Sequence, residues 1–69
     1  MNQPLRALRL QEVERRTGLT RPTIYRRAKD GTFPKPIRLG GNSSGWIESE
    51  IEAWLADRVA QRDAQAGAQ

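Results

Sequence analysis

Two short helical patterns separated by only three residues constrain the fold of this 69-residue chain more than any other feature. The first pattern runs from about Gln11 to Thr17 and is followed by Gly18, a residue that commonly ends helices because it adopts positive φ without steric strain. The second pattern begins near Arg21 and stops at Asp30-Gly31. Two short helices joined by so short a connection predict a helix-turn-helix.

The start of the second pattern carries residues that favour helix initiation. We expect Thr20 to be the N-cap, with its hydroxyl accepting a hydrogen bond from a free backbone N–H. Pro22 lies in the first turn, where a missing N–H has little effect. Ile24 and Ala28, at positions i and i+4, predict a narrow apolar face toward the core. The polar side chains that then project outward are Arg21, Thr23, Arg26 and Arg27, with Lys29 lower on the flank.

This outward face has the groups that proteins use to read duplex DNA. Arginine donates paired hydrogen bonds to guanine in the major groove, threonine methyls contact thymine, and cations bind phosphates. Arg26 and Arg27 lie about 100° apart on a helix and cannot both point at bases, so we assign Arg26 to the groove and Arg27 to the DNA backbone. Thr20 and Arg21 are expected backbone anchors, because free N–H groups at a helix N-terminus favour phosphate.

A small β-hairpin is predicted after the second helix. Pro34 and Pro36 exclude helix and favour extended backbone. Two short apolar segments, 37–39 and 45–47, then flank the sequence GGNSS, whose glycines and asparagine tolerate positive φ. Contact with phosphate or with the minor groove is the functional interpretation of this turn, and a flexible exposed turn is the alternative. The contact residues would be Arg38 at the hairpin base and Asn42, Ser43 or Ser44 at the tip.

The last helix is predicted from about Glu50 to Arg62. A capping box of Ser49 and Glu52, a hydroxyl followed three residues later by a glutamate, would begin it. Apolar residues behind this box recur at helical spacing and are expected to face the core. We therefore assign both tryptophans to the core rather than to stacking on nucleic acid bases. The stripe consists of Ile51, Trp54, Leu55 and Val59, and Phe33, Trp46 and Ile47 are expected to join the same core.

The length of the chain predicts one small domain. We expect a winged helix-turn-helix at residues 8–62, mainly α with a small β-hairpin, between a flexible arm at 1–7 and a disordered tail at 63–69. No apolar run is long enough for a signal peptide or a membrane span, which predicts a cytoplasmic protein with no membrane partner.

The residue types that are missing narrow the possible chemistry. The chain has no cysteine and no histidine, so thiolate metal sites and imidazole general bases are excluded. A domain of this size also has little room for a deep catalytic cleft. The predicted class is a binding protein, not an enzyme, with no metal, no cofactor and no small-molecule substrate.

Positive charge is concentrated in the middle of the sequence. The net charge is +4 at pH 7, but residues 15–38 contain eight lysines and arginines against Asp30 alone, whereas residues 1–14 are neutral and residues 39–69 are net acidic. Such a block indicates a surface that meets a polyanion. Two alternatives remain open, a merely solvated basic helix and a small adaptor that binds an acidic protein partner. RNA is less favoured, because Tyr25 is the only aromatic residue expected outside the core.

Several motifs, taken in order, resemble the AlpA-like family of small phage and prophage regulators, relatives of excisionases and of the MerR-type DNA-binding domain. They are RLQEV at the first helix, TGLTRPTIYR at the turn, FPKPIRLG before the hairpin and GWIESEIEAWL at the end, and they cover roughly residues 8–58. The resemblance implies a MerR-like fold of three helices plus a wing. It also implies sequence-specific binding to double-stranded DNA, with the second helix in the major groove, the wing alongside and no enzymatic activity.

The same resemblance implies a biological role. Such proteins regulate transcription of a mobile-element or prophage gene, or act as recombination directionality factors that bend DNA at attachment sites, in the bacterial nucleoid. Further copies of the chain on neighbouring DNA are expected as additional partners, because one small module makes few contacts. Two residues depart from the family pattern: Pro22 replaces a small polar residue that could contact phosphate, and Ala28 is smaller than the aliphatic residue expected toward the core.

Overall fold

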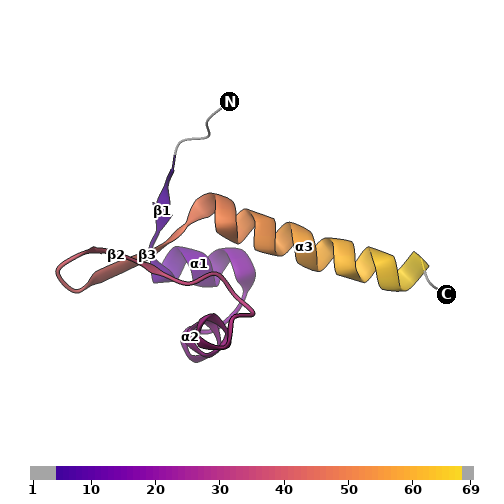
Figure 1. Ribbon diagram of the computed structural model, residues 1–69, viewed down its shortest axis with the longest axis horizontal. Helices are drawn as coiled ribbons and strands as arrows, with labels where there is room; N and C mark the ends of the chain where they lie inside the picture. Colours follow the sequence, from indigo (N-terminus) through magenta and orange to yellow (C-terminus); the bar gives the residue numbers. More distant parts are fainter. Residues whose placement is uncertain (1–4, 68–69) are drawn as a thin grey trace.

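Three helices and a small antiparallel sheet make up the computed structural model, which describes residues 5–67, and the β2–β3 hairpin projects from the helices (Figure 1). Strand β3 is central and pairs antiparallel with β1 on one side and with β2 on the other. This arrangement confirms the predicted winged helix-turn-helix, with β2 and β3 as the wing. The elements in chain order are β1 (Ala7–Leu8), α1 (Leu10–Thr17), α2 (Arg21–Asp30), β2 (Ile37–Gly40), β3 (Ser43–Ile47) and α3 (Glu48–Gly67).

Glycines end the first two helices, as the sequence predicts. Gly18 and Gly31 adopt φ of 75° and 87°, and their backbone N–H groups donate to carbonyl oxygens of the preceding turn. The predicted bounds of α2 are confirmed, and α1 begins at Leu10, one residue before the predicted start. Positive φ strains any side chain with a Cβ, so glycine is the residue that allows two such abrupt endings.

Thr20 lies at the N-cap of α2, but the predicted capping hydrogen bond is wrong. Its backbone is extended, with φ −88° and ψ 162°, as an N-cap requires. The Thr20 hydroxyl makes no bond to a backbone N–H and instead donates to the Thr23 hydroxyl across 3.2 Å. The Thr20 hydroxyl thus bonds to a side chain three residues along the helix and not to the backbone of the first turn.

The wing turn is tighter than the sequence predicts. Gly40 already pairs with Ser43 across the hairpin, so only Gly41-Asn42 separates the strands, rather than the whole GGNSS segment. Gly40 and Gly41 have positive φ, of 114° and 56°, whereas no non-glycine residue among those described does. The register shifts between Arg38 and Gly40, which marks an irregularity in the ladder at this point.

The first strand begins within the segment predicted to be a flexible arm. Ala7 pairs with Ile47 and Leu8 with Trp46, and the carbonyl oxygen of Arg6 accepts a hydrogen bond from the backbone N–H of Glu48 at 2.8 Å. Residues 6–8 are therefore bound along the end of β3 and the start of α3. Residues 1–4 of the predicted arm lie outside the described residues.

Helix α3 differs from its prediction at both ends. It starts at Glu48, directly after β3, so Ser49 and Glu52 lie inside the helix and the predicted capping box is wrong. It also continues to Gly67, whereas residues 63–69 were expected to be disordered, and residues 68–69 lie outside the described residues. Alanine and glutamine are strong helix formers, and they dominate this end of the chain. Figure 1 shows the C-terminal half of α3 projecting away from the body.

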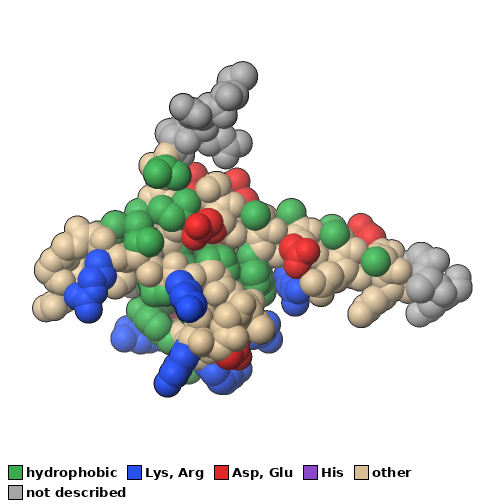
Figure 2. All heavy atoms as spheres, viewed as in Figure 1, with side chains coloured by type: hydrophobic (Ala, Val, Ile, Leu, Met, Phe, Trp, Pro, Cys, Tyr) green, Lys and Arg blue, Asp and Glu red, His purple; other side chains and the backbone are tan. Residues whose placement is uncertain are grey.

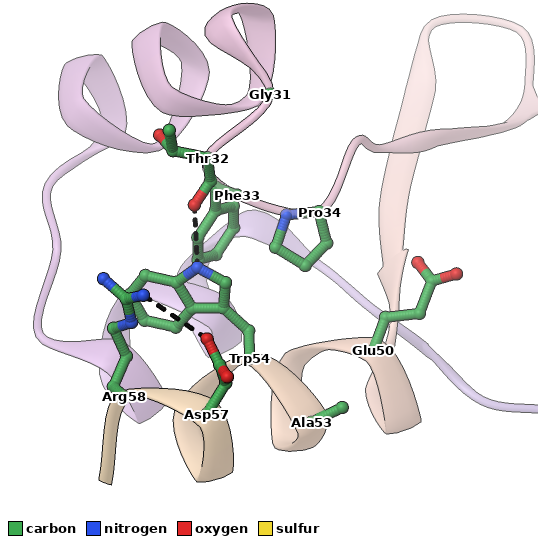
Figure 3. Close-up of a pocket in the computed structure, with 9 residues that line it drawn as sticks. All are labelled: Gly31, Thr32, Phe33, Pro34, Glu50, Ala53, Trp54, Asp57 and Arg58. Carbon is green, nitrogen blue, oxygen red and sulfur yellow. Dashed lines mark hydrogen bonds and ion pairs between the residues drawn. The ribbon is translucent and has the colours of Figure 1, made fainter. Parts of the chain in front are cut away.

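The core lies where α1, α2, α3 and β3 meet. Trp46 is its largest fully buried side chain, and its indole N–H donates to the Pro34 carbonyl oxygen at 2.9 Å. Trp54 is only partly buried and packs against the core. Its indole N–H donates a hydrogen bond to the carbonyl oxygen of Thr32 (Figure 3). Val59, expected in the apolar stripe, is 47% exposed, because α3 has left the body at that point. The buried apolar residues are Leu8, Val13, Ile24, Ala28, Phe33, Trp46 and Ile51.

Candidate nucleic-acid interface

Helix α2 presents a basic face to solvent because its apolar face is fixed in the core. Ile24 is fully buried and Ala28 nearly so, as their spacing predicts. Figure 2 shows lysine and arginine side chains gathered over α2, whereas acidic side chains lie along α3. Among the predicted contact residues of α2, Thr20, Arg21, Arg26 and Lys29 are exposed, and Thr23 and Arg27 are half-buried.

The two neighbouring arginines of α2 differ in exposure. Arg26 is exposed and Arg27 is half-buried, as the helical period requires for residues on different faces. This difference is compatible with Arg26 reaching furthest from the protein, although the assignment of one arginine to bases and the other to phosphate stays a prediction.

The only carboxylate of α2 is engaged within its own turn. Asp30 accepts hydrogen bonds from the backbone N–H of Thr32 at 3.0 Å and from the Thr32 hydroxyl at 2.6 Å. These bonds lower the pKa of Asp30 below its ordinary value, because they favour the charged form of the carboxylate. It stabilises the turn that follows α2 and lies at the opposite end of the helix from Arg21.

Arg21 is held by an aromatic side chain that the sequence did not single out as a contact. Its guanidinium lies over the ring of Tyr25, 5.4 Å from the centroid. The Tyr25 ring in turn meets the Trp46 indole edge to face, with centroids 5.7 Å apart. Contacts between Arg21, Tyr25 and Trp46 therefore connect the exposed start of α2 with the buried core.

A hollow of about 540 Å³ lies between the start of α1, the start of α2 and the wing. Of the predicted contact residues it contains Arg21, Asn42 and Ser44, and the fold does not bring the other predicted residues into it. Sequence reasoning missed Arg9 and Gln11, because they lie in the neutral N-terminal block, about ten residues before Arg21. The polar residues and tyrosine that line the hollow are Arg9, Gln11, Arg21, Tyr25, Asn42 and Ser44.

Three other predicted contacts, Arg38, Ser43 and Lys29, are not among the residues that line this hollow. Arg38 is exposed on β2 and pairs in register with Ser44 of β3, while Ser43 begins β3 at the tip of the wing. Lys29 and Lys35 line a smaller hollow on the other side of Tyr25. Lys29 of α2 and Lys35 of the loop before the wing thus share a hollow with Tyr25, whose ring also contacts Arg21.

Arg16 belongs to a structural ion-pair network rather than to the basic face. Its guanidinium contacts Glu12 at 3.0 Å and Glu48 at 2.9 Å, which joins α1 to the start of α3. The hydrogen bond from Arg16 lowers the pKa of Glu12, and the bonds to Glu12 and Glu48 raise the pKa of Arg16. Counting charge along the sequence could not separate this arginine from those of α2.

A second hollow, of about 560 Å³, lies beside Trp54 between α3 and the turn after α2 (Figure 3). Its charged lining consists of Glu50, Asp57 and Arg58, so its net charge is negative. Arg58 contacts Asp57 at 3.4 Å and lies over the Trp54 ring. This surface does not suit a polyanion, which leaves the α2 and wing side as the candidate interface.

No helix within residues 5–67 has the length and apolar character needed to cross a membrane.

A helix-turn-helix with a basic second helix and an adjoining two-stranded wing defines the winged helix-turn-helix class of protein. Residues 6–59 match the family described as prophage CP4-57 regulatory protein (AlpA), and the chain belongs to this family. The resemblance seen in the sequence motifs is thereby confirmed.

Two relatives show how far the similarity extends. The chain is 46% identical over 57 residues to the uncharacterized protein ORF88 of Enterobacteria phage P4, a match that covers 83% of this chain and 65% of the phage protein. It is 47% identical over 60 residues to the DNA-binding transcriptional activator AlpA of Escherichia coli (strain K12), covering 78% of this chain and 86% of AlpA. The chain thus spans less than two thirds of the phage P4 protein. No solved structure matches the chain.

Proposed function

We propose that the chain is a sequence-specific, double-stranded DNA-binding protein and not an enzyme. The observation that carries the proposal is the outward face of α2, where the exposed Arg26 projects from a helix anchored through Ile24 and Ala28. Forked cationic donors on a helix next to a wing match the hydrogen-bonding pattern of guanine in the major groove. The E. coli relative, a DNA-binding transcriptional activator, supports the same function.

In this account, the second helix reads bases and the surrounding groups fix its register. Arg26 contacts a base edge, and Arg27, Lys29 and Arg38 contact phosphates on either side. Thr20, Thr23, Asn42 and Ser43 supply hydrogen bonds to the DNA backbone. Within the cell, the protein regulates transcription of a mobile-element or prophage gene, or directs recombination by bending DNA at attachment sites, and it acts in the cytoplasm on the nucleoid.

Fluorescence anisotropy with labelled duplex DNA tests this function. The log of the binding constant should fall with log salt by about 0.9 for each phosphate contact, and a scrambled duplex should compete more weakly than the cognate duplex. Arg62→Ala serves as the matched control, because Arg62 is exposed on the distant end of α3 and pairs with Asp63. Equal competition by every duplex and by an acidic protein would instead favour the adaptor that binds an acidic partner.

The bend that the protein induces in DNA distinguishes a recombination directionality factor from a transcriptional regulator. A directionality factor should bend its site, which circular permutation gel shifts measure directly, and it should bind as several adjacent copies. A transcriptional regulator without an architectural role should leave the DNA close to straight and shift the activity of a promoter that carries its site.

A further inference from the structure

We propose that the hollow between α1, α2 and the wing holds one phosphodiester group of the DNA backbone, with Arg9 and Arg21 as its cationic ligands. The proposal rests on the proposed function and adds to it a residue outside both the helix-turn-helix connection and the basic block of the sequence. It makes the start of α1 a third DNA contact, beside α2 and the wing.

The charge of the hollow selects an anion. Arg9 and Arg21 line it together with Asn42 and Ser44, and no carboxylate is among its lining residues. Within residues 5–67 neither arginine takes part in an ion pair, in contrast to Arg16. Two unpaired guanidinium groups beside an amide and a hydroxyl form a set of hydrogen-bond donors that suits the oxygens of a phosphodiester.

Arg9 is held by its backbone at the start of α1, and its side chain takes no part in capping the helix. Arg9 is the N-cap of α1, and its carbonyl oxygen accepts from the N–H groups of Glu12 and Val13 at 3.0 and 3.1 Å. Its side chain makes no capping bond. The helix therefore holds the backbone of this arginine in place at the edge of the hollow that Arg9 lines.

Tyr25 positions the second arginine. Arg21 lies over the Tyr25 ring at 5.4 Å, and that ring rests edge to face on Trp46, which is fully buried. A cation stacked on a supported aromatic ring loses less conformational freedom when it binds its ligand than a free side chain does. Tyr25 thus acts on the phosphodiester through Arg21.

The position of the hollow favours a DNA phosphodiester over a free phosphate ion. Arg21 is the first residue of α2, and Arg26 lies on the same helix about 1.4 turns later. A phosphate held at Arg21 would therefore fix the register of α2 against the neighbouring bases, which is what backbone contacts do in protein–DNA interfaces.

The test uses a cognate duplex with one phosphate at a time replaced by an uncharged methylphosphonate. Wild-type protein should lose about tenfold in affinity at one linkage, as expected for a charged hydrogen bond. Arg9→Ala should bind the unmodified duplex about tenfold more weakly, should lose its sensitivity at that linkage, and should lower the salt slope by about 0.9. Arg62→Ala should keep all three wild-type properties.

The possible outcomes separate the two proposals. If the wild-type protein binds the duplex but Arg9→Ala has wild-type affinity, salt slope and methylphosphonate pattern, the phosphodiester site is overturned and the proposed function stands. If the wild-type protein does not bind duplex DNA, both are overturned. Binding of millimolar inorganic phosphate to the hollow that leaves the affinity for the duplex unchanged at constant ionic strength would assign the hollow to free phosphate and would also overturn the backbone contact.

Variants of Tyr25 test the positioning role. Tyr25→Phe keeps the ring and should bind as wild type, whereas Tyr25→Leu should weaken binding several-fold. In an Arg21→Ala background, Tyr25→Leu should cause no further loss, because the two residues act as one unit. An equal loss in both backgrounds, with unchanged thermal unfolding, would contradict this role.

Discussion

The indole N–H of Trp54 donates to the carbonyl oxygen of Thr32 across 2.8 Å and joins α3 to the turn after α2 (Figure 3). The same indole meets the Phe33 ring edge to face, with centroids 4.8 Å apart. One partly buried side chain therefore links the long C-terminal helix to the end of the helix that we propose enters the major groove.

Removing this hydrogen bond should weaken the fold without abolishing it. Trp54→Phe keeps an aromatic ring but leaves the Thr32 carbonyl without its partner, so the free energy of unfolding should fall by about 1 kcal/mol. Trp54→Ala also removes the packing on Phe33 and should lower it by about 3 kcal/mol. Urea unfolding followed by circular dichroism measures both, and a Trp54→Phe variant as stable as wild type would contradict the role of the bond.

The contact of Arg16 with Glu12 predicts a pH dependence. Because the folded state lowers the pKa of Glu12, the pair stabilises the protein at pH values above the ordinary glutamate pKa. This stabilisation should be lost as the pH falls through the lowered pKa of the folded state. Arg16→Gln should therefore reduce the melting temperature at pH 7, and the difference from wild type should shrink toward pH 2.

A control variant separates this pair from general acid denaturation. Arg62→Gln removes an equal charge from an exposed pair near the end of α3. Its melting temperature should follow wild type at every pH. If Arg16→Gln were destabilised equally at acid and neutral pH, the ion-pair explanation would fail.

Gly45 is required by close packing in the central strand. A Cβ at this position would lie 3.0 Å from the Leu39 side chain and 3.1 Å from the backbone oxygen of Leu8. Gly45→Ala should therefore separate β3 from its neighbours and lower the free energy of unfolding by about 1–3 kcal/mol. Ser44→Ala, one residue earlier on the same strand, should change it little. Thermal unfolding of both variants gives the comparison, and equal stabilities would refute the packing argument.

Arg26 and Arg27 should have different effects on DNA binding. Arg26→Ala should relax sequence preference at one base pair by about 1–3 kcal/mol, as expected for loss of a base contact. Arg27→Ala should instead weaken binding to all duplexes alike and reduce the salt slope by about 0.9. Anisotropy titrations over a set of single-base-pair variants distinguish the two patterns, and a uniform loss for Arg26→Ala would make Arg26 a phosphate contact.

Local signals predicted the helix-turn-helix well. Gly18 and Gly31 end their helices by positive φ, and the i, i+4 pair of Ile24 and Ala28 faces the core. These features depend on residues close in sequence, so their physical cause is visible before folding. The basic face of α2 follows directly from them.

Contacts between distant segments could not be predicted in the same way. Helix α3 begins at Glu48, whose backbone N–H donates to the carbonyl oxygen of Arg6, a residue far away in sequence, and Ser49 therefore lies inside the helix. The hollow similarly joins Arg9 to Arg21 and Asn42, which only the folded chain brings together. Charge counting placed Arg9 in a neutral block and so missed it.

Selection of bound fragments from random duplex DNA tests the central claim most directly. The account predicts that fragments recovered by the wild-type protein share one short motif, and that Arg26→Ala recovers a motif degenerate at one position. Recovery of fragments without any shared motif would contradict sequence-specific DNA binding by α2.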